Sequence, residues 1–355
     1  MRHITLSIIL ALSLAACSGD DNPVAPEPEP DPGYDFSPIL TDFADKTVIP
    51  TYKHLAAVST DLLTAVMNLK NNPSSATLGT ARAKWVAART PWEQSEGFLF
   101  GPVDFAGYDP ALDSWPVNRT DLEAVLGSND PLTKTSVNNL ANELKGFHTI
   151  EFLLFDEGGS KNIDDFTPRQ YDYLIAATEL LVDAAVALHT SWIASGENFR
   201  AEVANAGAGS SAYTTQKAAA QEMVNGMIGI ADEVGNGKIA DPFTERDTRL
   251  VESQFSFNSL LDFQDNMRSI RNVYEGGYNV EAMGLDEFIK SKDPALDQRV
   301  KAEIQATITE IGKISFPFRD ALATDAAQIT AAQQAIATLQ QTLEGDVMSL
   351  VLAEQ

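Results

Sequence analysis

Apolar residues recur at steps of three and four from Phe36 almost to the end of the chain, which is the spacing of amphipathic helices. In the first half, the pattern predicts helices over roughly 38–69, 75–97, 132–156 and 168–194. Residues typical of helix starts precede three of them, as Asn72-Pro73-Ser74, Asp130-Pro131 and Thr167-Pro168. In the second half, four more helices are predicted over roughly 214–234, 247–275, 294–320 and 323–353. The pattern therefore predicts an all-α protein.

Two stretches interrupt this pattern. Residues 98–130 contain Gly101-Pro102, Asp109-Pro110 and Trp115-Pro116, and they predict a long irregular segment of the kind that often carries function. The stretch from Ala204 to Ser211 is rich in Gly, Ala and Ser and is interpreted as a linker. It divides the helical region into residues 36–203 and 204–355, each with four predicted helices.

The two halves share one local spacing. Arg89 is followed seven residues later by Glu96-Gly97, and Arg268 is followed seven residues later by Glu275-Gly276. Each pair closes the second predicted helix of its half. We therefore predict two tandem four-helix bundles related by internal duplication.

The N-terminus has the features of an export signal. Met1-Arg2-His3 is followed by an apolar run from Ile4 to Ala16, too short to remain as a membrane span. Leu14-Ala15-Ala16-Cys17 resembles a bacterial lipobox, which implies a signal peptide over residues 1–16 and lipidation of Cys17. As the sole cysteine, it has no intrachain disulfide partner. Residues 17–35 are rich in Pro, Asp and Glu and predict an extended tether between the lipid and the helical region. The expected location is the bacterial cell envelope, on the outer membrane or its periplasmic face, with the membrane as a partner.

The charge balance narrows the possible partners. The chain has 50 Asp and Glu residues against 25 Lys and Arg residues. Nucleic acid is therefore not expected as a partner, because its binding requires basic surfaces. Metal cations or other cationic ligands suit the chain better, although acidity also keeps an exported protein soluble.

The third predicted helix carries the first candidate chemistry. His148 and Glu151 lie in an otherwise apolar stretch, Gly146 to Phe155, and at a spacing of three they share one helix face. A buried imidazole and a buried carboxylate need partners. A metal ion is one such partner, and a neighbouring polar side chain of the core is another.

Glu93 and Glu96 form a second pair at the same spacing, near the end of the second predicted helix. If the two helices pack together, one nitrogen and three carboxylates would meet, as in helical bundles that hold iron or manganese. Asp104, Asp109 and Asp113 could add further oxygen ligands. The competing interpretation is that Glu93 and Glu96 face solvent.

Several enzyme classes find no support in the sequence. Beyond the signal, only His54, His148 and His189 are present, and the His-Glu-x-x-His arrangement of many zinc peptidases does not occur. The chain also has no Gly-x-Ser-x-Gly elbow and no glycine-rich phosphate loop.

Three separated segments resemble the imelysin family, which is also classed as peptidase M75 or insulin-cleaving membrane protease-like. Gly146-x-His148-x-x-Glu151 is similar to the family's Gly-x-His-x-x-Glu signature. The stretch from Trp92 to Pro102 is similar to a second marked segment. The third comprises Gly237 to Pro242, Glu252 to Ser256, and the Asp262-x-x-x-Asn266 spacing. The resemblance covers about residues 38 to 350.

The resemblance implies a two-bundle helical fold with the His-x-x-Glu pair near the junction of the halves, in an outer-membrane or periplasmic protein. Relatives in iron-uptake systems imply a metal site, and the matching metal candidates in this sequence are His148, Glu151, Glu93 and Glu96. The leading hypothesis is a lipoprotein that binds a divalent or ferric metal ion, iron rather than zinc, for uptake with partners in the envelope. A surface metallopeptidase and a module that binds another ligand between the bundles are the alternatives.

Overall fold

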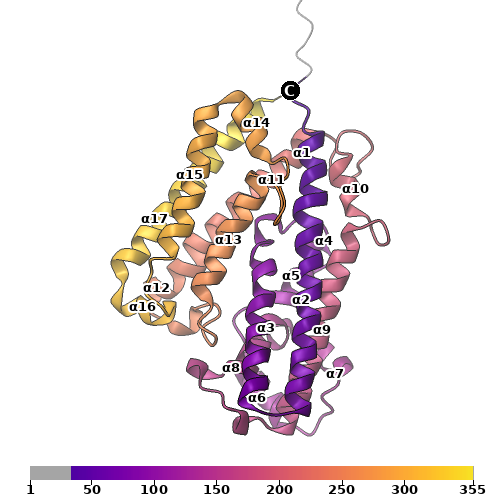
Figure 1. Cartoon of the computed structure of the whole chain (residues 1–355), viewed down its shortest axis with the longest axis vertical. Helices are drawn as coiled ribbons and strands as arrows, with labels where there is room; N and C mark the ends of the chain where they lie inside the picture. The colour runs from indigo at the N-terminus through magenta and orange to yellow at the C-terminus, as the bar shows by residue number, and fades with distance from the viewer. Residues whose placement is uncertain (1–32, 355) are drawn as a thin grey trace, which may run out of the picture. The chain divides into compact units, whose positions relative to one another are not determined.

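The long helices predicted from the hydrophobic pattern are present in the structure, a computed structural model that describes residues 33–354 (Figure 1). No strand occurs among these residues, so the all-α prediction is confirmed. In the first half, the helices that form the packing framework are α1 (Ser37–Asp42), α2 (Ile49–Asn71), α3 (Ser75–Glu93), α8 (Gly146–Phe155) and α9 (Pro168–Trp192). A π-helical segment, Phe43–Val48, joins α1 to α2.

The capping signals act where the sequence places them. The Ser74 hydroxyl accepts from the Thr77 amide at 3.2 Å, and the Thr77 hydroxyl accepts in return from the Ser74 amide, which fixes the start of α3. Thr167 and Gln170 make the same reciprocal pair at the start of α9, with Pro168 in its first turn. The predicted starts of these two helices are therefore accurate.

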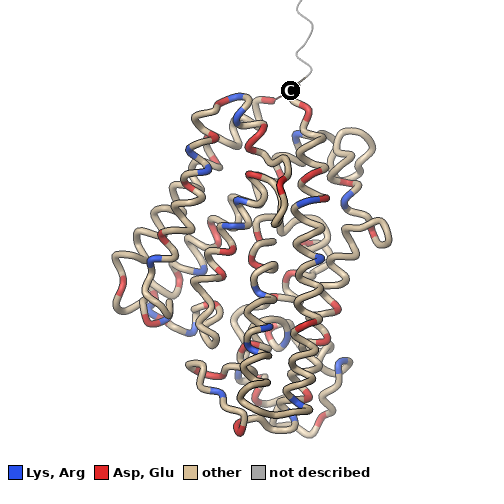
Figure 2. The backbone as a smooth tube through the Cα atoms, in the orientation of Figure 1, with Lys and Arg blue, Asp and Glu red and all other residues tan. Residues whose placement is uncertain are grey.

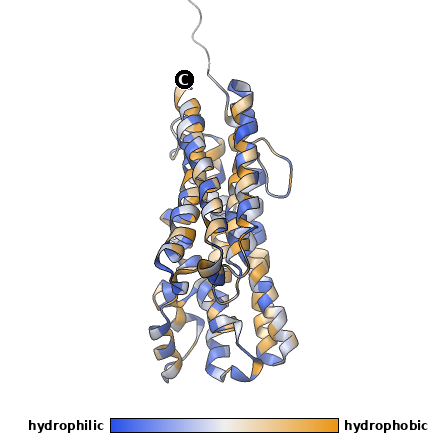
Figure 3. Cartoon of the chain, turned by 90° about the vertical axis from the view of Figure 1, so that its left-hand side faces the viewer, coloured by the Kyte–Doolittle hydropathy of each residue, from blue (hydrophilic) through white to orange (hydrophobic). Residues whose placement is uncertain are grey.

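In the second half, the framework consists of α11 (Gln216–Asp232), α13 (Ser259–Tyr274), α15 (Pro294–Ile311) and α17 (Ala326–Thr342). A π-helical segment, Glu233–Ile239, extends α11 into α12 (Ala240–Glu245), and another, Leu343–Val347, extends α17 into α18 (Met348–Ala353). The remaining helices are α10 (Phe199–Ala204), α14 (Leu285–Lys292) and α16 (Phe318–Thr324). The helices carry apolar and polar stripes (Figure 3), as expected for elements with one face in a core.

The predicted third helix, 132–156, is not continuous. The chain forms α7 (Lys134–Asn138), a 3₁₀ turn at Asn142–Leu144, and then α8. The break lies before Gly146, which has a φ of +73°; a Cβ on it would lie 2.4 Å from the carbonyl oxygen of Leu112. Only glycine permits this close approach, which brings the end of α5 beside the start of α8.

Residues 98–130 are more ordered than predicted. They contain α4 (Pro102–Phe105), α5 (Tyr108–Asp113) and α6 (Arg119–Gly127), so the expectation of an irregular segment is wrong for much of this stretch. The predicted helix 247–275 starts later than expected, at Ser259, because residues 251–258 are irregular and include positive φ angles at Ser253 and Phe257.

The helices of the two halves pack on each other. α2 contacts α3 and α9, α15 contacts α13 and α17, and α13 packs directly against α3. The described residues belong to one compact unit, and the domain boundary at 203/204 and the internal duplication stay predictions. The two arginines that share the spacing to a Glu-Gly pair have different environments. Arg89 is fully buried, whereas Arg268 is partly exposed and pairs with Asp265 at 2.8 Å.

The N-terminal predictions lie largely outside the described residues. The signal peptide, Cys17 and the tether up to residue 32 belong to this part of the chain. The last tether residues are described: the Tyr34 amide donates to Glu354 at 2.6 Å, and the Tyr34 ring packs on Phe288. Within residues 33–354, α9 is long and apolar enough to cross a membrane, but it packs on α2, α7 and α8 as a core helix does.

Candidate metal centre

A buried arginine organises the charged groups between α3 and α13. Arg89 is fully buried on α3, and its guanidinium contacts carboxylates from four different parts of the chain. It donates to Glu252 at 2.8 Å and lies 3.6 Å from Asp262, and it pairs more closely with Glu93 and Asp113. Because arginine presents several donors in a rigid plane, one side chain fixes the positions of these acids relative to one another.

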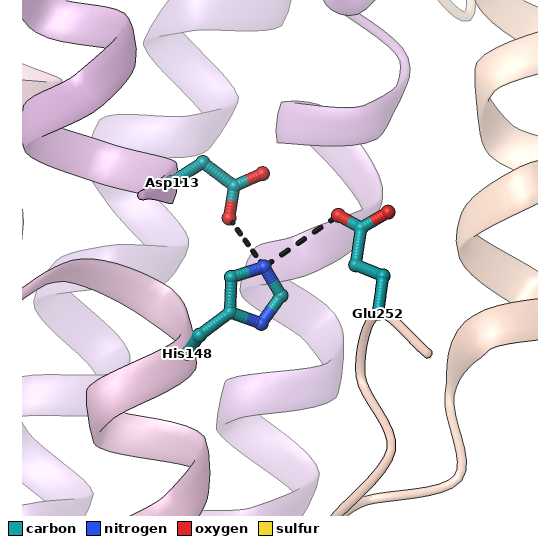
Figure 4. A group of neighbouring side chains, drawn as sticks. All are labelled: Asp113, His148 and Glu252. Atoms are coloured by element: carbon teal, nitrogen blue, oxygen red, sulfur yellow. Dashed lines mark ion pairs between the residues drawn. The ribbon is translucent and has the colours of Figure 1, made fainter. Parts of the chain in front are cut away.

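His148 lies beside this cluster and faces two of the same acids (Figure 4). Its Nε2 is 3.1 Å from Asp113 and 3.5 Å from Glu252, and the imidazole is fully buried with Trp115 packed edge-on against it. Despite these distances, Nε2 makes no hydrogen bond of good geometry. Asp113 is held from its other side by the indole N–H of Trp92 at 2.5 Å. The Nε2 atom of the imidazole therefore faces two carboxylates that come from separate segments of the chain.

Glu151 supports His148 rather than joining the cluster around Asp113. One carboxylate oxygen, Oε2, lies 3.3 Å from Nδ1 of His148. The other, Oε1, accepts from the Phe255 amide at 3.0 Å and from the Ser256 amide and hydroxyl at 2.8 and 2.7 Å. A carboxylate on Nδ1 orients the ring and directs Nε2 toward a ligand, which is the usual supporting arrangement of metal-binding histidines. Glu151 also fixes the loop that begins with Glu252.

Glu93 and Glu96 are buried, which excludes the interpretation that they face solvent. The amide nitrogen of Asn266 donates to Glu93 at 2.6 Å and to Glu96 at 2.7 Å. The ammonium of Lys238 lies 2.7 Å from Glu96 and 3.6 Å from Glu93. The neutral amide of Asn266 and the cationic Lys238, both from the second half, thus hold the acidic pair of the first half.

Burial and local charge divide the acids into two kinds. Burial raises the pKa of Glu93 to about 8, against the opposing charges of Arg89 and Lys238. Burial, reinforced by neighbouring Glu93, also raises the pKa of Glu96 well above its ordinary value. Burial acts in the same direction on Asp262, whose pKa rises to about 7. These acids therefore take up protons more readily than exposed acids do, and a cation bound at Glu93 and Glu96 would compete with those protons.

Asp113 and Glu252 behave in the opposite way. Burial alone would raise the pKa of Asp113, but the charges of Arg89 and His148 outweigh it and lower that pKa. For Glu252, the charge of Lys238 and the contact with His148 overcome burial and lower the pKa to about 2. Burial would lower the pKa of His148, yet Asp113 raises it well above the ordinary value. The cluster is therefore a set of paired charges around two carboxylates that stay ionised.

A cavity of about 450 Å³ adjoins the cluster. Asp113, Glu252, Lys238 and Trp115 are among the residues that line it. Further lining acids are Glu96, Asp109, Glu233 and Asp241. Burial, with the nearby charge of Asp113, raises the pKa of Asp109 to about 6. Acidic residues outnumber basic ones along the described chain (Figure 2), and in this cavity Lys238 is the one basic residue among the described lining residues. The cavity therefore favours cations over anions.

Two overlapping groups have the donor atoms and spacing for a metal ion. Asp113, His148 and Glu252 each offer a ligand atom within 4.8 Å of the others, and so do Glu93, Glu96 and Asp113. The first group fits a metal better, since it combines an imidazole nitrogen with two carboxylates, and His148 Nε2 and Glu252 Oε2 have ion-pair neighbours but no hydrogen bond of good geometry. One imidazole with several carboxylates suits iron or manganese, whereas soft metals prefer thiolates.

The predicted site residues therefore lie close together but have different environments. His148 contacts Asp113 and Glu252, and Glu93 and Glu96 lie near Asp113 in the adjoining group, while Glu151 supports the imidazole. Glu252 and Lys238 lie in segments that resemble the family but had no assigned role in the sequence. Asp113 was only one of the three acids that the sequence offered as additional ligands in the stretch 98–130. Its position in a short helix two residues before Trp115 is a weak signal that no fixed spacing would have selected.

Comparisons with known proteins agree with this fold. The model of the family described as Imelysin, Peptidase_M75, matches residues 48–344. Iron-regulated protein A of Synechococcus elongatus is 33% identical over 318 residues, which cover 88% of this chain and 86% of that protein. A crystal structure described as an iron-regulated protein A precursor of Parabacteroides distasonis superposes with a TM-score of 0.82 at 30% identity, over 89% of this chain and 94% of that one. An imelysin-like protein of Psychrobacter arcticum has a TM-score of 0.73 at 14% identity, over 88% of this chain and 94% of that one, and shows the same fold.

Proposed function

This chain belongs to the imelysin family, and we propose that it binds a metal ion, iron, as cargo through Asp113, His148 and Glu252. The observation that carries the proposal is the convergence of three ligand groups, whose side chains are at most 6% exposed, from α5, α8 and the loop before α13, with His148 Nε2 3.1 Å from Asp113 and 3.5 Å from Glu252. The relative named iron-regulated protein A supports a connection with iron. Glu93 and Glu96 lie next to this group and offer further oxygens.

The residues of the chain have distinct tasks in this proposal. Asp113 and Glu252 supply ionised oxygens, and His148 supplies nitrogen after losing the proton on Nε2. Glu151 holds Nδ1 of His148, and Arg89 fixes the two carboxylates at the distance that admits a cation. The acidic cavity draws cations toward this group.

Calorimetric titration of the purified protein with Fe²⁺ under anaerobic conditions tests the proposal. His148→Ala and Glu252→Gln should each weaken binding by at least about tenfold, a change of about 1.4 kcal/mol. His189→Ala is the matched control, because His189 lies on α9 outside the cluster. Wild-type affinity in both site variants, with the fold retained by circular dichroism, would refute the proposed site.

We further propose that the protein acts in iron uptake at the cell envelope, where the predicted lipid on Cys17 anchors it. The lipobox-like Leu14 to Cys17 and the acidic tether support this location. Cys17→Ser should release the protein from the membrane fraction without changing its iron affinity. Retention of that variant on membranes would contradict the anchor.

Peptide hydrolysis is the second candidate. Its support is that three ligand groups beside a cavity resemble the open arrangement of catalytic zinc sites. Zinc-dependent cleavage of an unstructured protein substrate, abolished by His148→Ala and retained in His189→Ala, would favour hydrolysis. Iron affinity without such cleavage would favour the binding role.

A further inference from the structure

Lys238 places an ammonium group inside the carboxylate cluster. It lies in the π-helical segment Glu233–Ile239, and its side chain is 10% exposed. Its Nζ is 2.7 Å from Glu96 Oε2, 3.2 Å from Glu252 Oε2, and 3.6 Å from Glu93 Oε2 and from Glu233 Oε1. A single positive charge thus serves four carboxyl groups, one of which belongs to the proposed iron ligands.

The ammonium leaves oxygen atoms of this cluster poorly satisfied. Glu252 Oε2 makes no hydrogen bond of good geometry although Lys238 is near, and neither does the fully buried Oδ1 of Asn266, whose amide nitrogen contacts Glu93 and Glu96. Buried polar atoms without partners are costly, so a ligand that engages more of them gains free energy. A multiply charged cation attracts the same carboxylates more strongly than an ammonium does.

The surroundings of Lys238 leave space for its side chain to adopt a second position. Lys238 lines the cavity of about 450 Å³, and the preceding Gly237 has open space where a Cβ would lie. A second cavity of about 290 Å³ shares Glu96 and Glu233 with the first. Glu233 is 51% exposed and already lies within 3.6 Å of Nζ, so it offers a partner nearer the solvent. π-helical turns are frequent at functional sites.

We propose that Lys238 is a specificity-determining residue: its ammonium is a tethered competitor that an incoming iron ion displaces from Glu96 and Glu252 toward Glu233. This rests on the proposed iron site. The tethered ammonium pairs with the carboxylates in the absence of metal. A cation must bind these carboxylates more strongly than the ammonium does, and monovalent cations do not. Displacement exposes the lysine amine to the cavity.

Amine labelling measures this displacement directly. The purified protein is treated with an amine-reactive acylating reagent with and without Fe²⁺, and modification of each lysine is followed by peptide mass spectrometry. Iron should raise the labelling rate of Lys238 by at least about tenfold, the change expected for about 1.4 kcal/mol of stabilisation of the exposed state. Lys301, which pairs with Asp286 and Asp297 away from the cluster, is the internal control and should not respond. An unchanged or reduced rate at Lys238 overturns the proposal.

Substitution provides a second, independent measurement. Lys238→Met keeps the length of the side chain without its charge and should raise Fe²⁺ affinity by at least about tenfold. Lys301→Met should leave it unchanged, and affinity in Lys238→Met equal to or below that of the wild type would contradict a competing role. Failure of the iron site itself is distinguishable, because then Fe²⁺ would bind the wild type and His148→Ala equally. If iron binding depends on His148 but the labelling of Lys238 does not change, the displacement of Lys238 is refuted and the iron site is retained.

Discussion

Replacement of Arg89 by methionine perturbs the centre of the charge cluster most strongly. Methionine retains much of the aliphatic stem but removes the donors to Glu93, Asp113 and Glu252 and the charge near Asp262. Arg89 is fully buried, so solvent does not screen the charges that remain. Loss of one partner of a buried ion pair typically costs about 3–5 kcal/mol, and we expect a loss of this size in the free energy of unfolding.

The size of the effect in a thermal experiment follows from the chain length. With an unfolding entropy of about 2.1 cal/mol/K per residue over the helical region, about 3–5 kcal/mol corresponds to a Tm lowered by roughly 4–7 °C. The loss should be greater at pH 8 than at pH 5, because acids that can take up protons need the guanidinium less.

Arg268→Met is the matched control for this experiment. Arg268 has the same spacing to a Glu-Gly pair in the second half, but its side chain is 28% exposed and pairs with Asp265. Its loss should change the free energy of unfolding by about 1 kcal/mol or less. Urea denaturation of both variants, followed by circular dichroism, compares them directly. If Arg89→Met lies within about 1 kcal/mol of the wild type, the cluster does not depend on the guanidinium as described.

Three further expectations concern residues around the site. Gly146→Ala should destabilise the protein by more than about 1 kcal/mol, because its φ of +73° and the nearby Leu112 carbonyl leave no room for a Cβ; an unchanged urea midpoint would contradict this. Glu151→Gln should weaken Fe²⁺ binding by about 10–100-fold, less than His148→Ala does, because it disturbs only the support of the imidazole. If calorimetry gives Glu151→Gln a lower Fe²⁺ affinity than His148→Ala, Glu151 is itself a ligand. In urea titrations across pH, the lowered pKa values of Asp113 and Glu252 give stability that is present above their ordinary values and is lost as the pH falls through the folded values, near 2 for Glu252. The raised pKa of Glu93 acts oppositely, with stability lost as the pH rises from 4.5 through about 8, and Glu93→Gln should reduce that second decline, to which the raised pKa values of Glu96 and Asp262 also contribute.

Sequence reasoning succeeded where the signals are local. Ser74 and Thr167 mark helix starts because the capping residue and its partner lie within one turn. His148 and Glu151 were identifiable because two polar residues at helical spacing stand out in an apolar stretch. Their burial follows from the same pattern.

The parts that the sequence did not predict depend on contacts between distant segments. The helix break before α8 arises from the approach of Leu112 to Gly146, which no local propensity encodes. Glu252 reaches His148 from a loop more than 100 positions away, and Glu151 recognises that loop through backbone amides that any residue could supply. The central role of Arg89 was hidden because its spacing to Glu96 also occurs at Arg268, where no cluster forms.

Anomalous diffraction at the iron absorption edge, from crystals of this protein grown with iron, tests the central claim most directly. An iron peak is expected between His148 Nε2 and the carboxylates of Asp113 and Glu252, at bonding distance from the imidazole nitrogen. The peak should disappear in crystals of His148→Ala and persist in those of His189→Ala. An iron peak elsewhere in the molecule, with none in this group, would contradict the account.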